Sequence, residues 1–496
     1  MPTPTDAARS YTMHVISHTH WDREWYQDFQ GYRKRLVFQM DALLDLLEGQ
    51  PDFAGFHLDG QTACIFDYLE IRPEQRARLT RHLQTGRITI GPWFVMPDEF
   101  VVSGESLVRN FLLGHQHCAE FGVPAVKMGY VTDIFGHCSQ LPQILRGFGI
   151  ESAMLHRGTS CEDEHSEMVW EGADGSAVLL VKVYYGTGYN DFIFMRWFNW
   201  DDKRIREYEQ DKIRLATTPV LYSLDGNDHE PARRETLYEV QRVHGVMTET
   251  RVMHSTLPAY LQALWAALGD DWQQGRRRFV GELRTPAKVG QWNEVWNGCS
   301  SGRMPLKRTN DQIEWLLARG AEPLQAWLRL LGADDQQAYL RHAWQQLITN
   351  HPHDSIVGCS IDQVHHDMQY RFDQARLIGE QAVGEALTEL SLRLDLRAFG
   401  VGSRVTTLVN MATLPTGPVT AFSCEVPAGE FDQAEAEGKH PMFFDESGAP
   451  APCVITRVER GARIWPVMQK EYQPSAFYRS RDGFHNPQHH RERQRP

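Results

Sequence analysis

The chain has 496 residues, of which 42% are hydrophobic and 23% are charged, and its formal net charge at neutral pH is −13. This composition is typical of a globular protein, and the length indicates two to four domains rather than a single core. The acidic balance argues against a nucleic-acid binder, because binding phosphates needs a basic face, and no apolar run is long enough to cross a membrane.

Cysteine usage and the N-terminal residues bear on the compartment. The eight cysteines are scattered without a Cys-x-x-Cys pair, and Met1–Thr12 lacks the apolar segment of a secretory signal. These features predict reduced thiols in a cytoplasmic protein. The charge is compatible with a neutral carbohydrate substrate, and a homo-oligomer remains open.

Short apolar runs alternate with helical patterns through the first half of the chain, which is typical of α/β units. Met13–Ser17 predicts a buried strand, and Arg33–Glu48 predicts a helix with its apolar residues on one face. Further strands are expected at Arg87–Gly91, Lys127–Val131, Val178–Tyr185 and Pro219–Leu224, and further helices at Pro73–Thr85 and Glu105–Phe121.

The second half begins with a helical pattern and ends with strand patterns. Three long helices are expected at Gln312–Leu331, Asp335–Thr349 and roughly Ser360–Leu394. Short apolar runs after about residue 398 suggest strands of a β-sandwich. The last residues, Tyr478–Pro496, are polar and have no periodicity, so we expect them to be disordered.

These patterns predict an α/β protein with four segments. We expect a seven-stranded α/β barrel-like catalytic domain over residues 1–280 and a three-helix bundle over residues 281–396. An incomplete β-sandwich is expected over residues 397–477, followed by the tail at 478–496.

Three stretches far apart in the chain hold residues suited to metal binding or acid–base chemistry. They are His18–Tyr26 (HTHWDREWY), Thr132–His137 (TDIFGH) and Asn350–Ser355 (NHPHDS). Imidazole and carboxylate are the ligands of Zn²⁺ when thiolates are absent. The first two stretches follow predicted strands, where α/β folds place their ligands, so we expect one tetrahedral site drawn from all three. Aromatic residues such as Trp25 suggest a sugar as the substrate.

Each candidate also has a structural interpretation. His20 and Asp22 are two residues apart after a strand, so both can reach one ion, but such a loop can also simply cap the strand through hydrogen bonds. Asp133 precedes Gly136, which permits a tight turn, and it could instead be the N-cap of a helix starting near Leu141.

The remaining candidates have similar alternatives. His353 and Asp354 could cap the third long helix. Asp228 lies in Gly226-Asn227-Asp228-His229, where turn chemistry alone favours Asp and Gly.

Taken together and in this order, the motifs resemble those of glycoside hydrolase family 38, the α-mannosidases. They are His-x-His-Trp-Asp-Arg-Glu-Trp-Tyr, Asp-x-Phe-Gly-His and His-x-His-Asp-x-Ile-x-Gly. The stretches His57–Thr62 and Ile90–Trp93 resemble the bacterial branch of that family in particular. The resemblance runs from about residue 11 to about residue 470.

The resemblance implies roles at matching positions. His20, Asp22, Asp133 and His353 match the zinc ligands of the family. Asp133 also matches the nucleophile, and Asp228 matches the general acid/base.

Three further residues match positions that hold the mannose: Trp25, Arg157 and Asp354. Ile134 and Cys138 depart from the residues commoner in the family. They are neighbours of the implied chemistry rather than part of it.

The implied activity is that of a zinc-dependent retaining α-mannosidase acting on terminal α-linked mannose. A retaining glycosidase needs two carboxyl groups about 5–5.5 Å apart, one nucleophilic and one protonated. Zinc would keep Asp133 ionised, while burial away from the ion could hold Asp228 protonated.

Three alternatives remain open from the sequence. A zinc deacetylase on a similar barrel would use a free carboxylate as base and form no covalent intermediate. A hydrolase of mannosylglycerate-type small substrates would share the same motifs. An inactive, truncated remnant of the family is the third, because family members continue into further β-sandwich domains.

Overall fold

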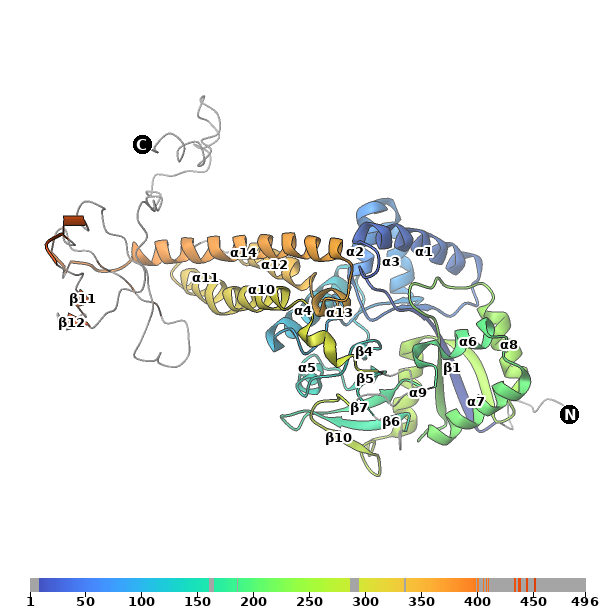
Figure 1. Ribbon diagram of the computed structural model, residues 1–496. Helices are drawn as coiled ribbons and strands as arrows, with labels where there is room; N and C mark the ends of the chain where they lie inside the picture. Colours follow the sequence, from blue (N-terminus) through green and yellow to red (C-terminus); the bar gives the residue numbers. More distant parts are fainter. Residues whose placement is uncertain are drawn as a thin grey trace. The chain divides into compact units, whose positions relative to one another are not determined.

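The computed structural model describes residues 9–397, except 160–164, 185, 286–293 and 334–335, together with a few positions between 399 and 451 (Figure 1). The chain divides into two compact units, residues 1–384 and 385–496. All predicted site residues belong to the first unit.

The first sheet of this unit is built around β1 (Tyr11–Thr19). β1 pairs in parallel with β8 (Val220–Asp225) along one edge and with β9 (Thr250–Ser255) along the other. Its last two residues pair with β2 (Phe56–Leu58), which continues to β3 (Ile88–Thr89). β1 is buried over its last seven residues, as expected of a central parallel strand covered on both faces.

The second sheet has the order β10-β6-β7-β5-β4. All of its neighbouring strands are parallel except β6 and β7, which are antiparallel. The strands are β4 (Gly129–Val131), β5 (Ser152–Leu155), β6 (Glu167–Glu171), β7 (Ala177–Lys182) and β10 (Arg278–Val280).

Helices surround both sheets. α1 begins where Asp28 accepts a hydrogen bond of 2.9 Å from Gly31 N, and it buries one apolar face that includes Leu36 and Leu43. The helices of the α/β part are α1 (Phe29–Gly49), α2 (Ala63–Ile71), α3 (Arg76–Gln84), α4 (Gly104–Glu120), α5 (Leu141–Gly147), α6 (Asp191–Trp197), α7 (Asp202–Leu215), α8 (Thr236–Val246) and α9 (Leu257–Leu268).

The helical part follows, with its long helices running side by side (Figure 1). A single π-helical segment, Leu316–Ala321, joins the first two helices. Trp344 and Phe372 of this part share one core with Phe94 and Val95 of the α/β part, so the two parts pack as one body. The helices are α10 (Met304–Trp315), α11 (Glu322–Leu330), α12 (Gln337–Ile348), α13 (His353–Val357) and α14 (Asp362–Ser391).

The α/β class with parallel sheets is confirmed. The described strands form two five-stranded sheets, so the single seven-stranded barrel stays a prediction. The expected β-sandwich strands and the tail lie outside the described residues, apart from isolated positions. A short antiparallel pair, β11 (Phe443–Phe444) and β12 (Pro450–Ala451), lies in the same region but was not among the expected strands. The four domain boundaries also stay predictions. Among the described residues, no helix is both long enough and apolar enough to span a membrane.

Candidate metal and catalytic centre

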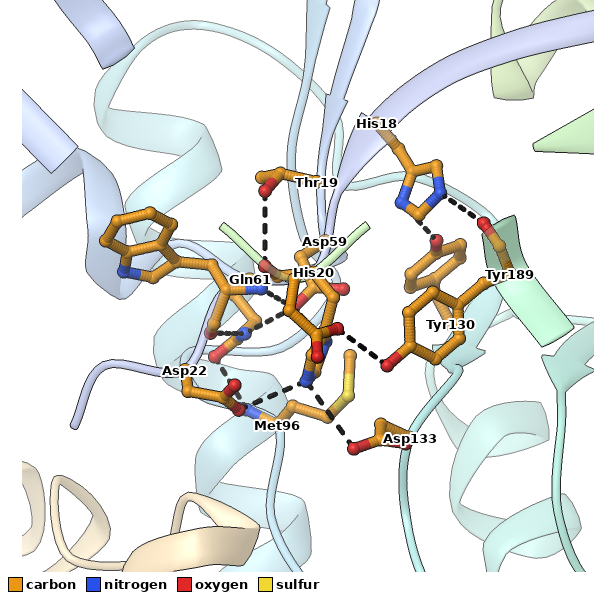
Figure 2. A network of polar contacts seen from close by, with 12 residues as sticks. His18, Thr19, His20, Asp22, Asp59, Gln61, Met96, Tyr130, Asp133 and Tyr189 are labelled. Atoms are coloured by element: carbon orange, nitrogen blue, oxygen red, sulfur yellow. Dashed lines mark hydrogen bonds and ion pairs between the residues drawn. The ribbon is translucent and has the colours of Figure 1, made fainter. Parts of the chain in front are cut away.

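The end of β1 delivers His20 and Asp22. The main chain of His20 forms a parallel bridge with Asp228, in the loop that follows β8. Beyond the bridge, the side chains of His20 and Asp22 face each other, with 3.1 Å between His20 Nε2 and Asp22 Oδ1 (Figure 2). Both residues are buried, so this contact lies at the carboxyl ends of the strands and away from bulk solvent.

Asp133 and His353 complete the cluster. Asp133 lies just after β4, and its Oδ2 is 3.8 Å from His20 Nε2 and 3.5 Å from His353 Nε2. His353 opens α13, and its Nε2 is 3.4 Å from Asp22 Oδ1. The structure therefore brings together all four side chains that were expected to hold the metal.

The donor atoms lie close enough together to share one metal ion. Zinc–nitrogen and zinc–oxygen bonds of about 2.0–2.1 Å put the corners of a tetrahedron about 3.4 Å apart. Four of the six separations between these donor atoms run from 3.1 to 3.8 Å, and the donor atoms of His20, Asp133 and His353 all lie within 4.8 Å of one another. Among the described residues, His20 Nε2, Asp22 Oδ1 and His353 Nε2 are buried without a hydrogen-bond partner. Buried polar atoms are almost always satisfied, so these three favour a cation as the missing partner.

Arg157 lies against Asp133. Its Nη2 is 2.5 Å and its Nε 3.1 Å from Asp133 Oδ1, and its Nη1 donates to Glu294 O at 2.7 Å. Burial works to raise the pKa of Asp133, but Arg157, followed by His353 and His20, holds that pKa well below its usual range. Asp133 is thus kept as a carboxylate. Contact of Arg157 with a sugar stays a prediction.

Asp228 has the opposite environment. Burial raises the pKa of this carboxyl, the charges of Asp133 and Asp22 add to the rise, and His20 opposes it. The Tyr189 hydroxyl also opposes it, because it donates a hydrogen bond of 2.8 Å to Asp228 Oδ1. The result is a carboxyl group that holds its proton more tightly than an exposed aspartate.

Asp354 lies next to the cluster. Its Oδ2 is 3.8 Å from His353 Nε2, and its carboxylate, Asp22 and His353 form a second group of donor atoms within 4.8 Å of one another. Burial raises the pKa of Asp354 to about 8, and Cys359 Sγ donates to its Oδ1 at 3.0 Å. Asp354 is therefore placed where it can act on a ligand of the same centre.

Trp25 lies on the loop that carries Asp22. Its ring is half-buried and packs edge-on against the exposed ring of Tyr26, with centroids 4.8 Å apart. The loop is pinned to the start of α14, because Ile361 N donates to Trp25 O at 3.0 Å. A role of Trp25 in holding the sugar stays a prediction.

The helix-capping alternatives for the candidates are wrong. The position before α5 is Gln140, so Asp133 lies seven residues away from the cap. His353 and Asp354 lie inside α13, and α14 begins only at Asp362. The polar side chains in these loops face one another instead of the helix ends.

Sequence reasoning missed three residues that orient the cluster: Asp59, Tyr189 and His229. His229 Nε2 lies 3.3 Å from Asp22 Oδ2 and accepts a hydrogen bond from Asp22 N at 3.1 Å. Its position next to Asp228 in the sequence could have indicated that His229 belongs to the site. Asp59 lies at the site because β2 pairs with β1, and Tyr189 lies there because of the path of the chain after β7. Neither position can be predicted from the local sequence pattern.

The sequence matches two family models, and their descriptions agree with a sugar-cleaving centre. The model "Glycosyl hydrolases family 38 N-terminal domain" matches residues 10–280, and "Alpha mannosidase middle domain" matches residues 294–390. The fold and site thus define a member of the glycoside hydrolases. More specifically, the chain belongs to glycoside hydrolase family 38.

Similar proteins support this assignment. A protein of Halalkalibacterium halodurans named "Putative mannosylglycerate hydrolase" is 34% identical over 403 residues, which are 77% of this chain and 43% of that protein. Human "Alpha-mannosidase 2C1" is 26% identical over 388 residues, 77% of this chain and 35% of the human protein. A crystal structure of an alpha-mannosidase from Enterococcus faecalis V583 matches with a TM-score of 0.70 at 32% identity, covering 79% of this chain and 44% of that chain. The chain thus spans less than half the length of these relatives.

Proposed function

We propose that this chain carries the centre of a zinc-dependent retaining α-mannosidase that removes terminal α-linked mannose. One observation carries the proposal: two aspartates at one centre have opposite electrostatic surroundings. Asp133 is held ionised beside Arg157, whereas partial burial and the neighbouring aspartates raise the pKa of Asp228. A retaining glycosidase needs this pair, one carboxylate and one carboxylic acid.

The two carboxyl groups have different roles in the proposed reaction. Asp133 attacks the anomeric carbon while Asp228 gives its proton to the departing glycosidic oxygen, which leaves a mannosyl ester on Asp133. Asp228, now ionised, takes a proton from water as that water cleaves the ester and restores both groups. Zinc, when bound by His20, Asp22, Asp133 and His353, would supply a Lewis acid for sugar hydroxyl groups.

The sugar would be held by residues around the cluster. Asp354 offers an acceptor next to His353, and Trp25 offers an aromatic face on the loop after β1. Aromatic rings and buried carboxylates of this kind bind the apolar faces and the hydroxyl groups of pyranoses.

The direct test measures metal content and activity together. Purified chain is assayed on 4-nitrophenyl α-mannoside before chelation, after chelation and after zinc is restored. We expect about one zinc per chain, loss of turnover with chelator and recovery with zinc. An Asp133→Ala variant is the control, because it should stay inactive when zinc is restored. Full activity after all metal is removed would contradict the proposal.

A second substrate has support from one comparison. The 34% identical relative carries the name of a mannosylglycerate hydrolase, whose substrate would be a small acidic mannoside. A panel of mannosylglycerate, α-mannosyl disaccharides and the aryl mannoside separates the two candidates by kcat/KM. A preference for mannosylglycerate would move the assignment to that activity with the same catalytic residues.

The same assays address the other sequence-based expectations. A chain that binds zinc but turns over no mannoside would favour the inactive remnant. A deacetylase would act on acetylated sugars without a covalent intermediate, and a fluorinated mannoside that labels Asp133 would exclude it. Cytoplasmic location and homo-oligomerisation stay predictions.

A further inference from the structure

His20 is held from the side that faces away from the cluster. Its Nδ1 lies 2.9 Å from Asp59 Oδ2, while its Nε2 faces Asp22 and Asp133 (Figure 2). A neutral imidazole has a proton on only one ring nitrogen, so the partner of one nitrogen decides whether the other can bind a cation. A carboxylate 2.9 Å from Nδ1 favours the tautomer with its proton on that nitrogen, which leaves Nε2 free to bind a cation.

Asp59 is fixed by further contacts. Its Oδ2 also accepts hydrogen bonds of 2.8 Å from Trp21 N and from Gln61 Nε2. Asp59 is fully buried and has a left-handed backbone with φ of 50°, a conformation that few residues other than glycine adopt. The parallel register of Thr19 opposite Leu58 sets this position, because it puts the next residue of each strand side by side.

Gln61 extends the contact to the second imidazole. Its Nε2 also donates to Trp21 O at 2.9 Å, and its Oε1 accepts from Met96 N at 2.9 Å. Met96 O in turn accepts from His353 N at 3.1 Å. A series of hydrogen bonds therefore joins Asp59, beside the first imidazole, to the backbone of His353, and Figure 2 shows this series as far as Met96.

The residues that form this series of hydrogen bonds are buried. Gln61 is 5% exposed, Met96 is 1% exposed and Asp59 is fully covered. The three side-chain contacts of Gln61 reach Asp59, Trp21 O next to His20, and Met96, whose carbonyl accepts from His353 N. A glutamine that served only to fill space would not need all three contacts.

We propose that Asp59 and Gln61 are positioning residues that aim the free ring nitrogens of His20 and His353 at one cation. The inference rests on the metal site of the proposed function. Asp59 acts directly on the ring of His20, and Gln61 acts through Asp59 and Met96. Outer partners of metal-binding histidines typically contribute about 10–100-fold to metal affinity.

The test measures zinc affinity of the full chain by competition with a chromogenic chelator. We expect Asp59→Asn, which keeps the shape but removes the charge, to weaken zinc binding by about 10–100-fold. The visible spectrum of the cobalt-substituted protein should change as well, because the ring of His20 can then rotate. Neither measurement depends on turnover.

Glu209→Gln is the matched control. Glu209 is another fully buried carboxylate that accepts two backbone hydrogen bonds, from Thr248 N and Glu249 N, but none of its recorded partners belongs to the cluster. Its zinc affinity should equal that of the wild type. A comparable loss in both variants would mean that general destabilisation explains the effect, and it would overturn the positioning role.

A second variant covers the case in which Asp59→Asn does not fold. Gln61→Met keeps the length of the side chain but can neither donate to Asp59 nor accept from Met96 N, and it should weaken zinc binding several-fold. Wild-type affinity in whichever variants fold would overturn the inference while leaving the metal site intact. A wild-type chain that binds no zinc would overturn the metal site and this inference together.

Discussion

At the scale of single residues, Asp133 and Asp228 show how different surroundings shift the pKa values of two identical side chains in opposite directions. Arg157 lies against the first, while the second is bounded by buried surface, a tyrosine hydroxyl and neighbouring negative charge. The guanidinium favours the charged form of Asp133, and burial favours the neutral form of Asp228. The opposite directions of the two pKa shifts follow from position in the fold and not from residue type.

This difference predicts the behaviour of Asp228→Asn. The amide cannot protonate a leaving group, so mannosides with poor leaving groups should lose about 10²–10⁴-fold in kcat/KM. Aryl mannosides with good leaving groups need no proton, and they should lose much less. Steady-state kinetics on both kinds of substrate checks the prediction, and an equal loss on both would count against Asp228 as the acid.

The pH profile is the control for this assignment. The active form has Asp228 protonated, and its pKa is raised, so activity should fall only as pH rises through that elevated value. In Asp228→Asn the alkaline limb should disappear for good leaving groups. An unchanged alkaline limb would assign it to another group.

At the scale of elements, a buried ion pair joins the loop after β1 to α14. Glu24 is fully buried, and both of its oxygens accept from Arg371 Nη2, at 2.8 and 2.9 Å. Ser355 of α13 donates to the same carboxylate at 3.1 Å. Glu24 therefore ties the segment with Asp22 to α14 through Arg371 and to α13, which begins with His353, through Ser355.

We predict that Arg371→Met lowers the free energy of unfolding by about 3–5 kcal/mol, because the buried Glu24 carboxylate loses its hydrogen-bonded guanidinium and keeps only Ser355 and the more distant Arg23, whose Nη1 is 3.9 Å away. Arg376→Ala is the control on the same helix, since its pair with Glu380 is exposed and should contribute no more than about 0.5 kcal/mol. Denaturant unfolding measures both. Similar losses in the two variants would show that the buried pair has no special role.

A double variant, Glu24→Gln with Arg371→Met, provides a second check. It removes both charges, so it should recover part of the stability lost in Arg371→Met alone. A further loss in the double variant would contradict the ion-pair explanation.

The elements also show what local pattern can predict. The apolar face of Arg33–Glu48 is a local signal, and α1 was found at Phe29–Gly49 with Asp28 as its cap. β2, with three residues, is too short to give a pattern of its own. β2 forms because it pairs with β1, and this pairing between distant parts of the chain cannot be predicted from the local sequence.

Some residues of the candidate site could be predicted from the local sequence pattern, and others could not. His20, Asp22 and Asp133 could be proposed because each follows an apolar run at a strand end, where parallel sheets gather their ligands. Asp59 could not, because its contact with His20 follows from the register of two strands. Arg157 was expected at a sugar, but its contact with Asp133 needed coordinates.

At the scale of the whole molecule, one cation would join segments that are distant in sequence. The four candidate ligands come from the segment after β1, from the loop after β4 and from the start of α13, between residues 20 and 353. The unfolded chain cannot keep these groups together, so metal binding should stabilise the folded state.

We therefore predict that zinc raises the melting temperature of the full chain. Free zinc at 100 times its dissociation constant should contribute about 2.7 kcal/mol. Scanning calorimetry with and without chelator measures the shift, and Asp133→Ala should show a smaller one. Equal melting temperatures for the chelated and zinc-loaded wild type would contradict a shared metal site.

The backbone bridge between His20 and Asp228 has a consequence for how this enzyme family can diversify. The spacing between the proposed proton donor and one proposed cation-binding ring is set by this bridge and by the pairing of β1 with β8, so rebuilding the surrounding loops need not disturb it. Directed evolution aimed at new glycosidic linkages should therefore tolerate insertions in peripheral segments. Insertions or deletions within residues 11–20 or 220–228 should be absent from the variants that remain active.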